Sequence, residues 1–405
     1  MTNLTNTNNK LIIVASAIRT VAGDEPFLNY AAIATNLNHA APSDSFDQPN
    51  KKEIYEPIFV NTIKDLDLIE SQERLHFHLE EALIELLEIY EGLLSEKRLL
   101  IYILVPATTT PRGASFDYNY IHDELKYIKD HFPQVSVKLI PLDKANAIEV
   151  LQNLAEKLFN NEIDYVIYGG ADSLIDPATV GQNAMMRTLH TTESADGLVL
   201  SEGAGFILLC SQKMLSSEKS NGNKLDQLGI IGGIATEYNK SSQNHEDLEN
   251  SINAVLTQSS LEIGQVDQIY HSFGASSDSQ LEWYKLSKKL WPVELSERQR
   301  SALMLGEINS DDINKLSTSK IAKQSSIHIS LGEVGAASFP LSIIMACGGF
   351  ENDQCFCDFK FSKDDHSLVC DSSADKARGA ILVSAPNSNI SRLQINLSEL
   401  ESEEI

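Results

Sequence analysis

The stretch of sequence that decides the fold is residues 163–210, IDYVIYGGADSLIDPATVGQNAMMRTLHTTESADGLVLSEGAGFILLC. An apolar run at 165–168 ends in GGAD at 169–172, and a second run at 205–210 is entered through SEGA at 201–204. Short apolar runs bounded by glycines are typical of buried strands, because glycine lets neighbouring backbones approach closely. The pattern predicts two core strands of an α/β sheet with a polar excursion between them.

Further strands and helices are predicted on both sides of this stretch. Residues 71–94 form the clearest helix, because their apolar side chains recur at the 3.6-residue spacing of an α-helix. Residues 38–52, with prolines at 42 and 49, are predicted to be a loop. Other helices are predicted at 123–132, 143–159, 246–257, 279–290 and 339–348, and strands at 11–17, 99–105, 135–139, 229–236, 268–272, 326–330 and 378–385. This alternation indicates a mostly parallel sheet with helices on both faces.

Composition and charge exclude several classes of function. The chain has 405 residues and a formal net charge of −25. A protein with this negative charge is repelled by nucleic acids and by anionic membranes unless it carries a basic patch, and no run of lysine and arginine supplies one. The longest apolar run, 339–347, is much shorter than the roughly 20 residues that cross a bilayer. We expect a cytoplasmic protein with a disordered polar leader at 1–10 and an acidic tail at 387–405.

Cysteine chemistry is also restricted. The chain has five cysteines, none of them in a CxxC arrangement: Cys210, Cys347, Cys355, Cys357 and Cys370. This spacing predicts neither a zinc site nor a disulfide framework, as expected in a reducing cytoplasm, and we expect no metal and no cofactor. Cys355 and Cys357 alternate as on a strand, which places both thiols on one face. We expect a structural role for them, with redox chemistry or metal binding as the alternative.

The order of the motifs resembles one known family. The chain carries, in this order, GGADS at 169–173, an Asp-Pro pair at 176–177, DG at 196–197, and SEGAG at 201–205, which leads into a strand. This order is similar to that in the β-ketoacyl synthase branch of the thiolase-fold proteins. The resemblance implies an α/β fold of two duplicated βαβαβ halves, layered α/β/α/β/α, with halves at 11–215 and 225–386. It also implies a homo- or heterodimer, because thiolase-fold proteins pair through an edge strand in the first half.

The nucleophile that the resemblance implies is missing. A ketosynthase carries its acyl chain on a cysteine thiolate at the start of the helix before the GGADS strand, where the helix dipole lowers the pKa of the thiol. Here that position falls on Lys144, and no cysteine precedes Cys210. Lys144 forms a Schiff base only if burial lowers its pKa. Asp143 is predicted to cap the helix, and Ser201, where the family has glycine, to be a structural hydroxyl.

The two histidines that the resemblance implies are only half present. The first would stabilise the oxyanion from a turn after a strand, and His271 occupies that place, with Gly274 and Glu282 also matching the family's spacing. The second belongs in a turn that reads LGEVGAAS at 331–338, where Gly332 stands in its place. Only His271 therefore has a counterpart. It is interpreted as a hydrogen-bonded core histidine, with catalysis as the alternative.

Three functions remain open. The sequence has the glycine turns of the family but lacks its nucleophilic cysteine and its second histidine. We therefore expect no catalytic residue, and an inactive scaffold that acts through contacts with other proteins. The sequence resembles most the thiolase-like proteins of type VI secretion gene clusters. This resemblance implies a role in assembling or loading secreted cargo, with an adaptor or effector as partner. The alternative is a chain-length-factor-like subunit, paired with an intact ketosynthase and an acyl carrier protein. A weaker alternative is an acyltransferase with non-standard chemistry.

Overall fold

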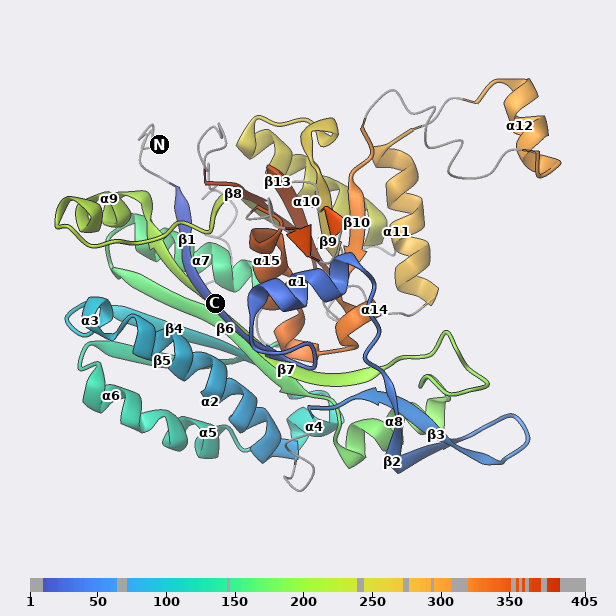
Figure 1. The fold of residues 1–405 in the computed structure, drawn as a ribbon, viewed down its shortest axis with the longest axis horizontal. Helices are drawn as coiled ribbons and strands as arrows, with labels where there is room; N and C mark the ends of the chain where they lie inside the picture. Colours follow the sequence, from blue (N-terminus) through green and yellow to red (C-terminus); the bar gives the residue numbers. More distant parts are fainter. Residues whose placement is uncertain are drawn as a thin grey trace, which may run out of the picture.

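Twelve of the described strands form one large sheet in the computed structural model (Figure 1). The structure describes residues 10–63, 71–143, 146–238, 244–271, 277–292, 295–307, 320–350, 355–356, 359–360, 364–372 and 377–386. The sheet has the strand order β10-β9-β13-β14-β8-β1-β7-β6-β4-β5, and β3 joins it by pairing with β7 and with β2. Its strands are β1 (Leu11–Thr20), β2 (Ala41–Pro49), β3 (Tyr55–Asn61), β4 (Leu99–Val105), β5 (Val135–Pro141), β6 (Tyr165–Ser173), β7 (Leu200–Ser211), β8 (Gly229–Tyr238), β9 (Gln268–His271), β10 (Lys323–Ser326), β13 (His366–Ser372) and β14 (Ala377–Ser384).

The helices cover this sheet in layers. The main ones are α1 (Pro26–Ala34), α2 (Ser71–Ile89), α3 (Glu91–Leu94), α4 (Pro111–Ala114), α5 (Tyr118–Glu124), α6 (Ile128–His131), α7 (Ala147–Phe159), α8 (Pro177–Met186), α9 (Gln212–Ser220), α10 (Asn244–Ser259), α11 (Ser277–Leu290), α12 (Glu297–Met304), α14 (Ile327–Leu331) and α15 (Ser338–Gly348). Short 3-10 turns η2 (Leu125–Tyr127), η3 (Ile263–Gln265) and η4 (Gly335–Ala337) and a small ribbon of β11 (Cys355–Phe356) and β12 (Phe359–Lys360) complete the described elements.

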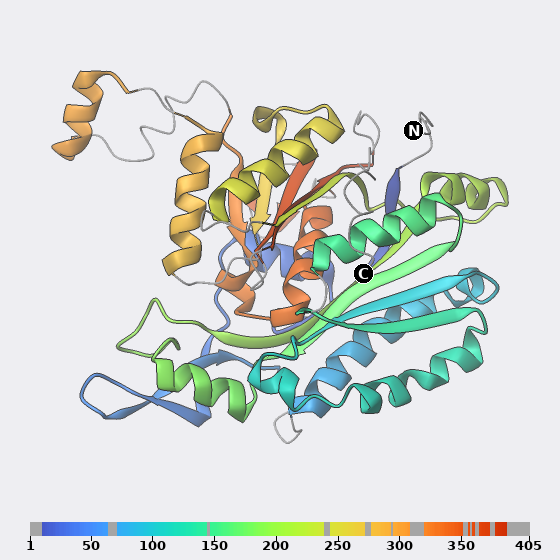
Figure 2. The ribbon, with the colours of Figure 1, turned by 180° about the vertical axis from the view of Figure 1, so that it is seen from behind.

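Two helices lie between the two halves of the sheet. α15 packs against β6 and β7 on one side and against β9, β13 and β14 on the other, and α7 likewise contacts both halves. α2 covers the outer face of β1, β6 and β7, while α10 covers β8 and β14 and packs against α11 (Figure 2). The apolar side chains of α15 are buried all round, as expected for a helix with sheet on two sides. The order of layers is α/β/α/β/α, as the motifs predict.

The sheet is mixed, so the prediction of a mostly parallel sheet is wrong. β4 runs parallel to β5 and β6, and β9 runs parallel to β10 and β13. In the middle of the sheet, β1, β6, β7, β8, β13 and β14 pair antiparallel. β1 pairs with β7 of the first half and with β8 of the second, and these pairings join the two halves into one sheet.

The two strands of the deciding stretch are β6 and β7, and they are buried neighbours as predicted. They pair antiparallel, with Gly169 opposite Phe206 and Asp172 opposite Gly203. A Cβ atom on Gly169 would lie 2.2 Å from the Phe206 ring and 2.3 Å from the carbonyl oxygen of Gly205. The glycines of this stretch therefore permit an approach that any side chain would block.

Two local predictions are wrong. Residues 41–49, expected to be loop, form β2, a strand exposed along most of its length at the edge of the hairpin with β3. Prolines are tolerated at such an edge, and an exposed strand lacks the apolar alternation that sequence reasoning looks for. Residues 326–330, expected to be a strand, turn into α14 after Ser326. Ile327 and Leu331 are buried there while Ile329 is exposed, a helical pattern that alternating apolar letters disguise.

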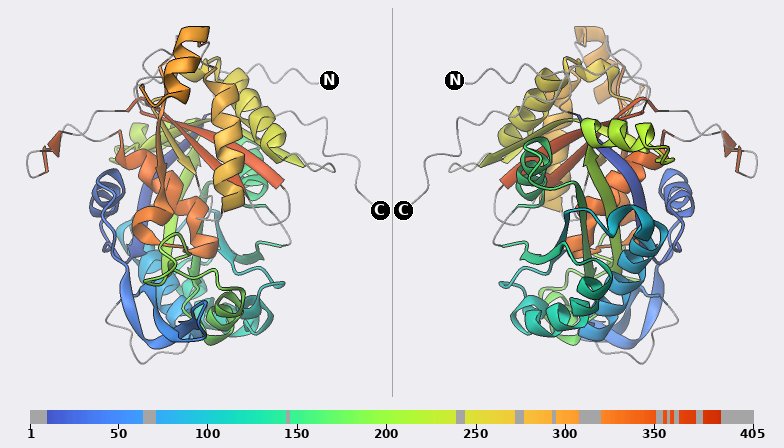
Figure 3. Two further views of the ribbon diagram at one scale, coloured as in Figure 1. Left: turned by 90° about the vertical axis from the view of Figure 1, so that its right-hand side faces the viewer. Right: turned by 90° about the vertical axis from the view of Figure 1, so that its left-hand side faces the viewer.

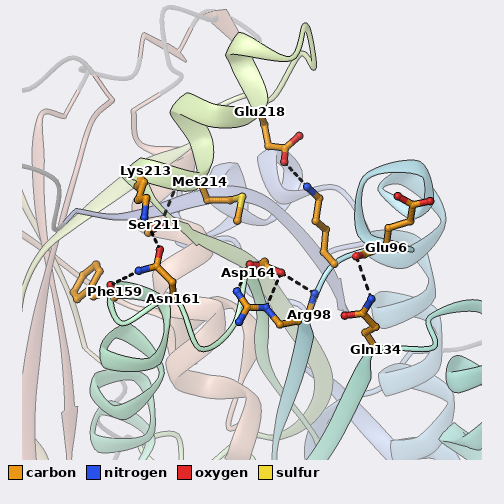
Figure 4. Close-up of polar contacts among 11 residues, drawn as sticks. Glu96, Arg98, Gln134, Phe159, Asn161, Asp164, Ser211, Lys213, Met214 and Glu218 are labelled. Carbon is orange, nitrogen blue, oxygen red and sulfur yellow. Dashed lines mark hydrogen bonds and ion pairs between the residues drawn. The ribbon is translucent and has the colours of Figure 1, made fainter.

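Two ion pairs hold the residues just before β4 and β6 against neighbouring elements (Figure 4). Asp164, just before β6, accepts hydrogen bonds from the Arg98 backbone N–H at 2.9 Å and from the Arg98 guanidinium at 2.6 and 3.1 Å. These bonds lower the pKa of Asp164. Beside them, the Nζ atom of Lys97 donates to the nearly buried Glu218 carboxylate of α9 at 2.7 Å. The two pairs hold β4, β6 and α9 together at one end of the sheet.

One helix stands apart from the layers. α12 projects from the second half, beyond α11 (Figure 3), and none of its residues is buried. Within the described part of the chain, no helix is both long enough and apolar enough to cross a membrane.

Candidate functional site

Two histidines meet at the ends of two parallel strands. β9 ends at His271 and β10 ends at Ser326, and the parallel register places these two residues side by side. The chain turns directly from β10 into α14, which carries His328 two residues later. His271 also stacks on the indole ring of Trp283, with 5.3 Å between ring centroids. The register therefore brings together two imidazoles that lie far apart in the sequence.

His328 is held by the segment that follows it. Its Nδ1 atom lies 3.0 Å from the carbonyl oxygen of Gly332 and 3.3 Å from the Oε2 atom of Glu333. The His328 side chain is almost fully buried, and its Nε2 atom has no hydrogen-bond partner among the described residues. A buried imidazole oriented through one nitrogen leaves the other available to a group that enters the site.

The setting of His271 disfavours a positive charge on its imidazole. Burial lowers the pKa of His271 to about 4, and the neighbouring His328 acts in the same direction. The His271 imidazole is therefore neutral at pH 7. Glu282, which sequence spacing grouped with His271, instead forms a two-point ion pair with Arg378, at 2.7 and 3.0 Å. That carboxylate is neutralised by a cation from β14.

Gly332 has a backbone reason to be glycine. Its φ is +76°, and a Cβ atom there would lie 2.8 Å from the carbonyl oxygen of Val199 and 2.9 Å from the Cβ atom of Ser201. The next residue, Glu333, pairs with the start of β7 through two backbone hydrogen bonds, one to Val199 and one from Ser201. No side chain fits at position 332 without moving β7, so a histidine at this position is sterically excluded here.

The turn after Glu333 rests on a buried ion pair. Asp172, at the end of the GGAD motif, accepts bonds from the Arg112 guanidinium at 2.7 and 2.6 Å and from the backbone N–H of Ala336 at 2.9 Å. A Cβ atom on Gly335 would lie 2.0 Å from the Asp172 carboxylate. Asp172 therefore joins β6, α4 and η4, and Gly335 must be glycine for the carboxylate to fit.

A second buried ion cluster lies at the start of β7. Glu202 forms a two-point ion pair with Arg74 of α2, and its Oε2 atom lies 3.3 Å from the Nε2 atom of His78 and accepts a hydrogen bond from Ser173. Burial alone would raise the pKa of Glu202, but the contacts with His78 and Arg74 outweigh it and lower the pKa to about 2. Glu202 is therefore ionised and fastens α2 to the sheet.

The start of α7, where the resemblance places the nucleophile, differs from the prediction. Lys144 lies outside the described residues. Asp143 does not cap the helix, because its carboxylate accepts bonds from the backbone N–H and hydroxyl of Thr108. The cap is Asn146, whose side-chain oxygen accepts from the N–H of Ile148 at 2.8 Å. α7 consequently begins at Ala147, four residues later than predicted.

The described cysteines are core residues. Cys210, Cys347 and Cys370 are free thiols, and all three are buried. Burial raises the pKa of Cys210 to about 12 and also raises that of Cys370. These two thiols are protonated at neutral pH, so neither resembles an activated nucleophile. No group of three or more His, Cys, Asp and Glu side chains among the described residues is arranged to hold a metal ion.

Sequence reasoning missed several residues of this region. His328 was overlooked because it lies on a helix that was predicted as a strand, and only the β9–β10 register places it beside His271. Arg74 and Arg112 had no signal in their spacing, because each pairs with an acid more than 50 positions away. Ser201 is buried and its hydroxyl donates to the carbonyl oxygen of Asn61 at 3.2 Å, in agreement with a structural hydroxyl.

Comparison with known proteins supports a ketosynthase-like fold. A sequence model of the β-ketoacyl synthase N-terminal domain matches residues 145–214, the segment that holds α7, β6 and β7. A search of curated protein sequences returns no match. The chain therefore has a thiolase-like fold of the kind found in ketosynthases.

Solved structures with this fold cover almost the whole chain. One is a type II PKS acyl-carrier protein in complex with its ketosynthase bound to the hexaketide, with a TM-score of 0.66 at 13% identity over 94% of this chain and all of that one. The ishigamide ketosynthase/chain length factor gives 0.58 at 13% identity, over 93% and 99% of the chains. An oxazolomycin ketosynthase domain from Streptomyces albus gives 0.67 at 12% identity, over 93% and 74%.

Proposed function

We propose that this protein is a non-catalytic ketosynthase-like scaffold that acts by binding other proteins, as an accessory or adaptor for cargo in a bacterial type VI secretion system. The observation that carries the proposal is the absence of any cysteine before Cys210 in a chain that otherwise keeps the β6 and β7 motifs. An acyl-transferring ketosynthase needs a thiolate at the start of α7. No cysteine is available there, wherever the alignment is drawn.

The buried charges favour structure over chemistry. Asp172, Glu202 and Glu282 are each neutralised by an arginine, so these acids stabilise the packing of helices on the sheet. Gly332 and Gly335 are required by backbone geometry and by Asp172. These contacts preserve the shape of a ketosynthase without supplying a nucleophile, which is the arrangement that a scaffold needs.

An edge of the sheet offers a surface for a partner. β5 is the last strand in the order, and among the described strands only β4 pairs with it. An open pocket of about 680 Å³ lies beside it, lined by Tyr118, Asn119, His122, Val137, Lys138, Leu139, Ile140 and Pro141. Unpaired backbone N–H and C=O groups beside a pocket of mixed polar and apolar lining favour addition of a strand from another chain. We place the dimer contact here.

The second candidate is a chain-length-factor-like subunit, which would pair through the same edge with an intact ketosynthase. The fold similarity to a ketosynthase/chain length factor favours it. Lys144 departs from the glutamine that this class usually carries at the nucleophile position. The neighbouring genes separate the two candidates: an intact ketosynthase and an acyl carrier protein favour this one, and spike and adaptor genes favour the secretion role.

The third candidate is an enzyme with non-standard acyl chemistry. The His328–Glu333 contact and the adjacent His271 favour it, because an imidazole oriented by a carboxylate can act as a general base.

Incubation with acyl-thioester donors tests the proposal directly. We expect the intact mass of the purified protein to stay unchanged after incubation with acyl-coenzyme A and with acylated carrier protein. The Lys144→Cys variant is the matched control, because it supplies a thiol at the position that the resemblance assigns to the nucleophile, and it should gain an acyl mass. An acyl adduct on the unmodified chain, at Lys144 or Ser201, would refute the scaffold proposal. Affinity capture from native cells then identifies the partners.

A further inference from the structure

β10 is the edge strand of the second half of the sheet. It stands at one end of the strand order, and among the described strands only β9 pairs with it. The backbone N–H of Lys323 donates to the carbonyl oxygen of Asp267 at 2.9 Å, on the β9 side. The backbone hydrogen-bonding groups of successive strand residues point to opposite sides, so the N–H and C=O groups of Gln324 point away from β9. Within the described part of the chain, this edge can therefore accept another strand.

Helix α11 lies over one face of this edge (Figure 1). The indole N–H of Trp283 donates to the side-chain oxygen of Gln324 at 2.7 Å, which places the helix on the face of β10 that carries Gln324. One flank of α11 is covered, because Lys289 pairs with α10 at 2.8 Å and Glu282 pairs with β14 at 2.7 Å. The other flank is the one that faces the edge of the sheet.

This second flank of α11 carries an exposed aromatic ring and a lysine. Successive helix residues are turned by about 100°, so Tyr284 and Lys288 lie on the side of α11 away from Lys289 and Glu282. Tyr284 is 59% exposed, and the Nζ atom of Lys288 lies over its ring, 5.4 Å from the centroid. The pair therefore stands beside the edge of β10 with apolar surface and positive charge open to solvent.

The described residues around the edge are basic, although the protein has a net charge of −25. Residues 281–290 and β10 contain a single acid, Glu282, and Arg378 neutralises it. The same residues carry four exposed lysines, at positions 285, 288, 289 and 323. Side chains alternate along a strand, so Lys323 lies on the face of β10 opposite Gln324 and α11. Positive charge therefore flanks the edge on both of its faces.

An extended acidic segment has the chemistry that matches this edge. Its backbone would pair with Gln324, and its side chains would alternate between the α11 face and the opposite face. Acids on one face would meet Lys288 and acids on the other would meet Lys323, while an apolar residue would cover Tyr284. A lysine on an edge strand also discourages pairing with strands that carry no acid. The same residue thus selects an acidic partner.

We propose that the edge of β10, together with the Tyr284–Lys288 flank of α11, binds an extended acidic segment of a partner protein, which adds to the sheet as a strand. The proposal is independent of the scaffold function and of the dimer contact at β5, because β10 and β5 stand at opposite ends of the sheet. The tail expected at 387–405 lies outside the described residues, and the proposal does not involve it. A second protein-binding surface is thereby assigned to this chain.

A defined peptide tests the edge on the full-length protein. The probe is a fluorescein-labelled peptide in which glutamate-valine-threonine-glutamate occurs twice, so that acids lie on both faces when it is extended. One control peptide has proline in place of both valines, which keeps the charge but removes strand pairing. The other has lysine in place of the glutamates. We expect fluorescence anisotropy to show saturable binding of the acidic probe, at least ten-fold tighter than that of either control.

Substitutions in the protein separate strand pairing from attraction by charge alone. Gln324→Pro removes the outward N–H and Gln324→Val keeps it, while both lose the side-chain bond to α11. We expect Gln324→Val to bind the acidic probe and Gln324→Pro to bind it at least ten-fold more weakly. Lys288→Glu with Lys323→Glu should weaken the acidic probe about ten-fold and strengthen the lysine peptide. Lys51→Glu with Lys52→Glu, exposed in the turn between β2 and β3, should change neither affinity.

Hydrogen exchange measured by mass spectrometry locates the probe on the wild type without any substitution. The acidic peptide should slow amide exchange in β10 and leave β5 unchanged. Circular dichroism verifies the fold of each variant. The proposal would be overturned by no binding of the acidic probe, by equal affinity for the proline peptide, by equal effects of the two Gln324 substitutions, by insensitivity to the charge reversal, or by protection of β5 in place of β10.

Discussion

Replacing Glu202 by glutamine removes one negative charge from a fully buried ion cluster and leaves the shape of the side chain almost unchanged. Arg74 and His78 contact the carboxylate from α2, and the backbone N–H of Ile63 donates to it at 2.9 Å. Glutamine still offers one acceptor oxygen, but it places an amide group against the Arg74 guanidinium. The substitution therefore tests how strongly this charge fastens α2 to β7.

The magnitude follows from the pKa of Glu202. The value falls from an ordinary 4.5 to about 2 on folding. Each pKa unit corresponds to 1.36 kcal/mol, so the ionised carboxylate stabilises the fold by about 3 kcal/mol relative to its neutral form. Because the folded pKa lies below the unfolded one, this stability is present above pH 4.5 and is lost as the pH falls towards 2. Leaving Arg74 buried without its partner gives a similar cost of about 3–5 kcal/mol.

Urea unfolding followed by circular dichroism measures the effect. We expect Glu202→Gln to lower the free energy of unfolding by about 3 kcal/mol at pH 7, and the difference from wild type to shrink by about 1 kcal/mol at pH 3.5, where the unfolded carboxyl takes up its proton. Glu162→Gln is the control. Glu162 pairs with Lys157 at 3.3 Å, but both side chains are about half exposed, so its loss should cost less than about 1 kcal/mol.

Two results would refute this reasoning about Glu202. One is a loss at pH 7 no larger than that of Glu162→Gln, which would mean that the buried cluster is energetically neutral. The other is a large loss that stays constant between pH 7 and pH 3.5. That outcome would assign the cost to the shape or hydrogen bonding of the side chain, because the charge of the wild-type carboxylate would then contribute no pH-dependent stability.

Three further predictions concern the partner edge, the histidine site and the turn. Light scattering should give at least a dimeric mass at micromolar concentrations, alone or with the products of neighbouring genes, and Ile140→Lys beside β5 should shift it towards the monomer; a strictly monomeric wild type would contradict this. His271→Ala should leave the biological activity largely intact, and loss of activity in a folded variant would point to catalysis. The pKa of His271 in the folded protein, about 4, lies below the ordinary 6.5. The wild type should therefore lose stability relative to this variant as the pH falls from 6.5 to 4. Ala336→Leu should overpack the η4 turn, lower the free energy of unfolding by about 1–3 kcal/mol and impair activity, because Ala336 is buried; an unchanged free energy in urea unfolding would contradict tight packing of this turn.

The core of the fold was predictable because its signals are local. Apolar runs ending in glycines at 165–173 and 200–211 become β6 and β7, since only buried strands combine such runs with close backbone approach. The layered thiolase-like arrangement also follows from the motif order. β2 was missed because it is an exposed edge strand that contains proline. α14 was misread because Ile327, Ile329 and Leu331 alternate in sequence but do not share one face.

The candidate site was less predictable because its members are brought together only by the tertiary structure. His328 and His271 become neighbours through the register of two short strands, and Arg112 meets Asp172 across 60 positions. No periodicity or spacing signals such a pair. Asp143 was wrongly predicted as a cap because a competing acceptor role, towards Thr108 of a distant loop, cannot be seen from neighbouring residues. The missing cysteine, by contrast, was visible at once, since absence from a sequence needs no alignment.

The position of β1 in the sheet affects how the protein can fold during its synthesis. Leu11 leaves the ribosome before its partner strands, which carry Ser211 and Ile231. At roughly 5–20 residues per second, synthesis of the intervening chain takes on the order of 10–40 s. During that interval the apolar strand has no partner, and such long-range pairing is slow even once both strands exist. We therefore expect the yield of folded protein to depend on the translation rate and on how well this strand is shielded from solvent before its partners emerge.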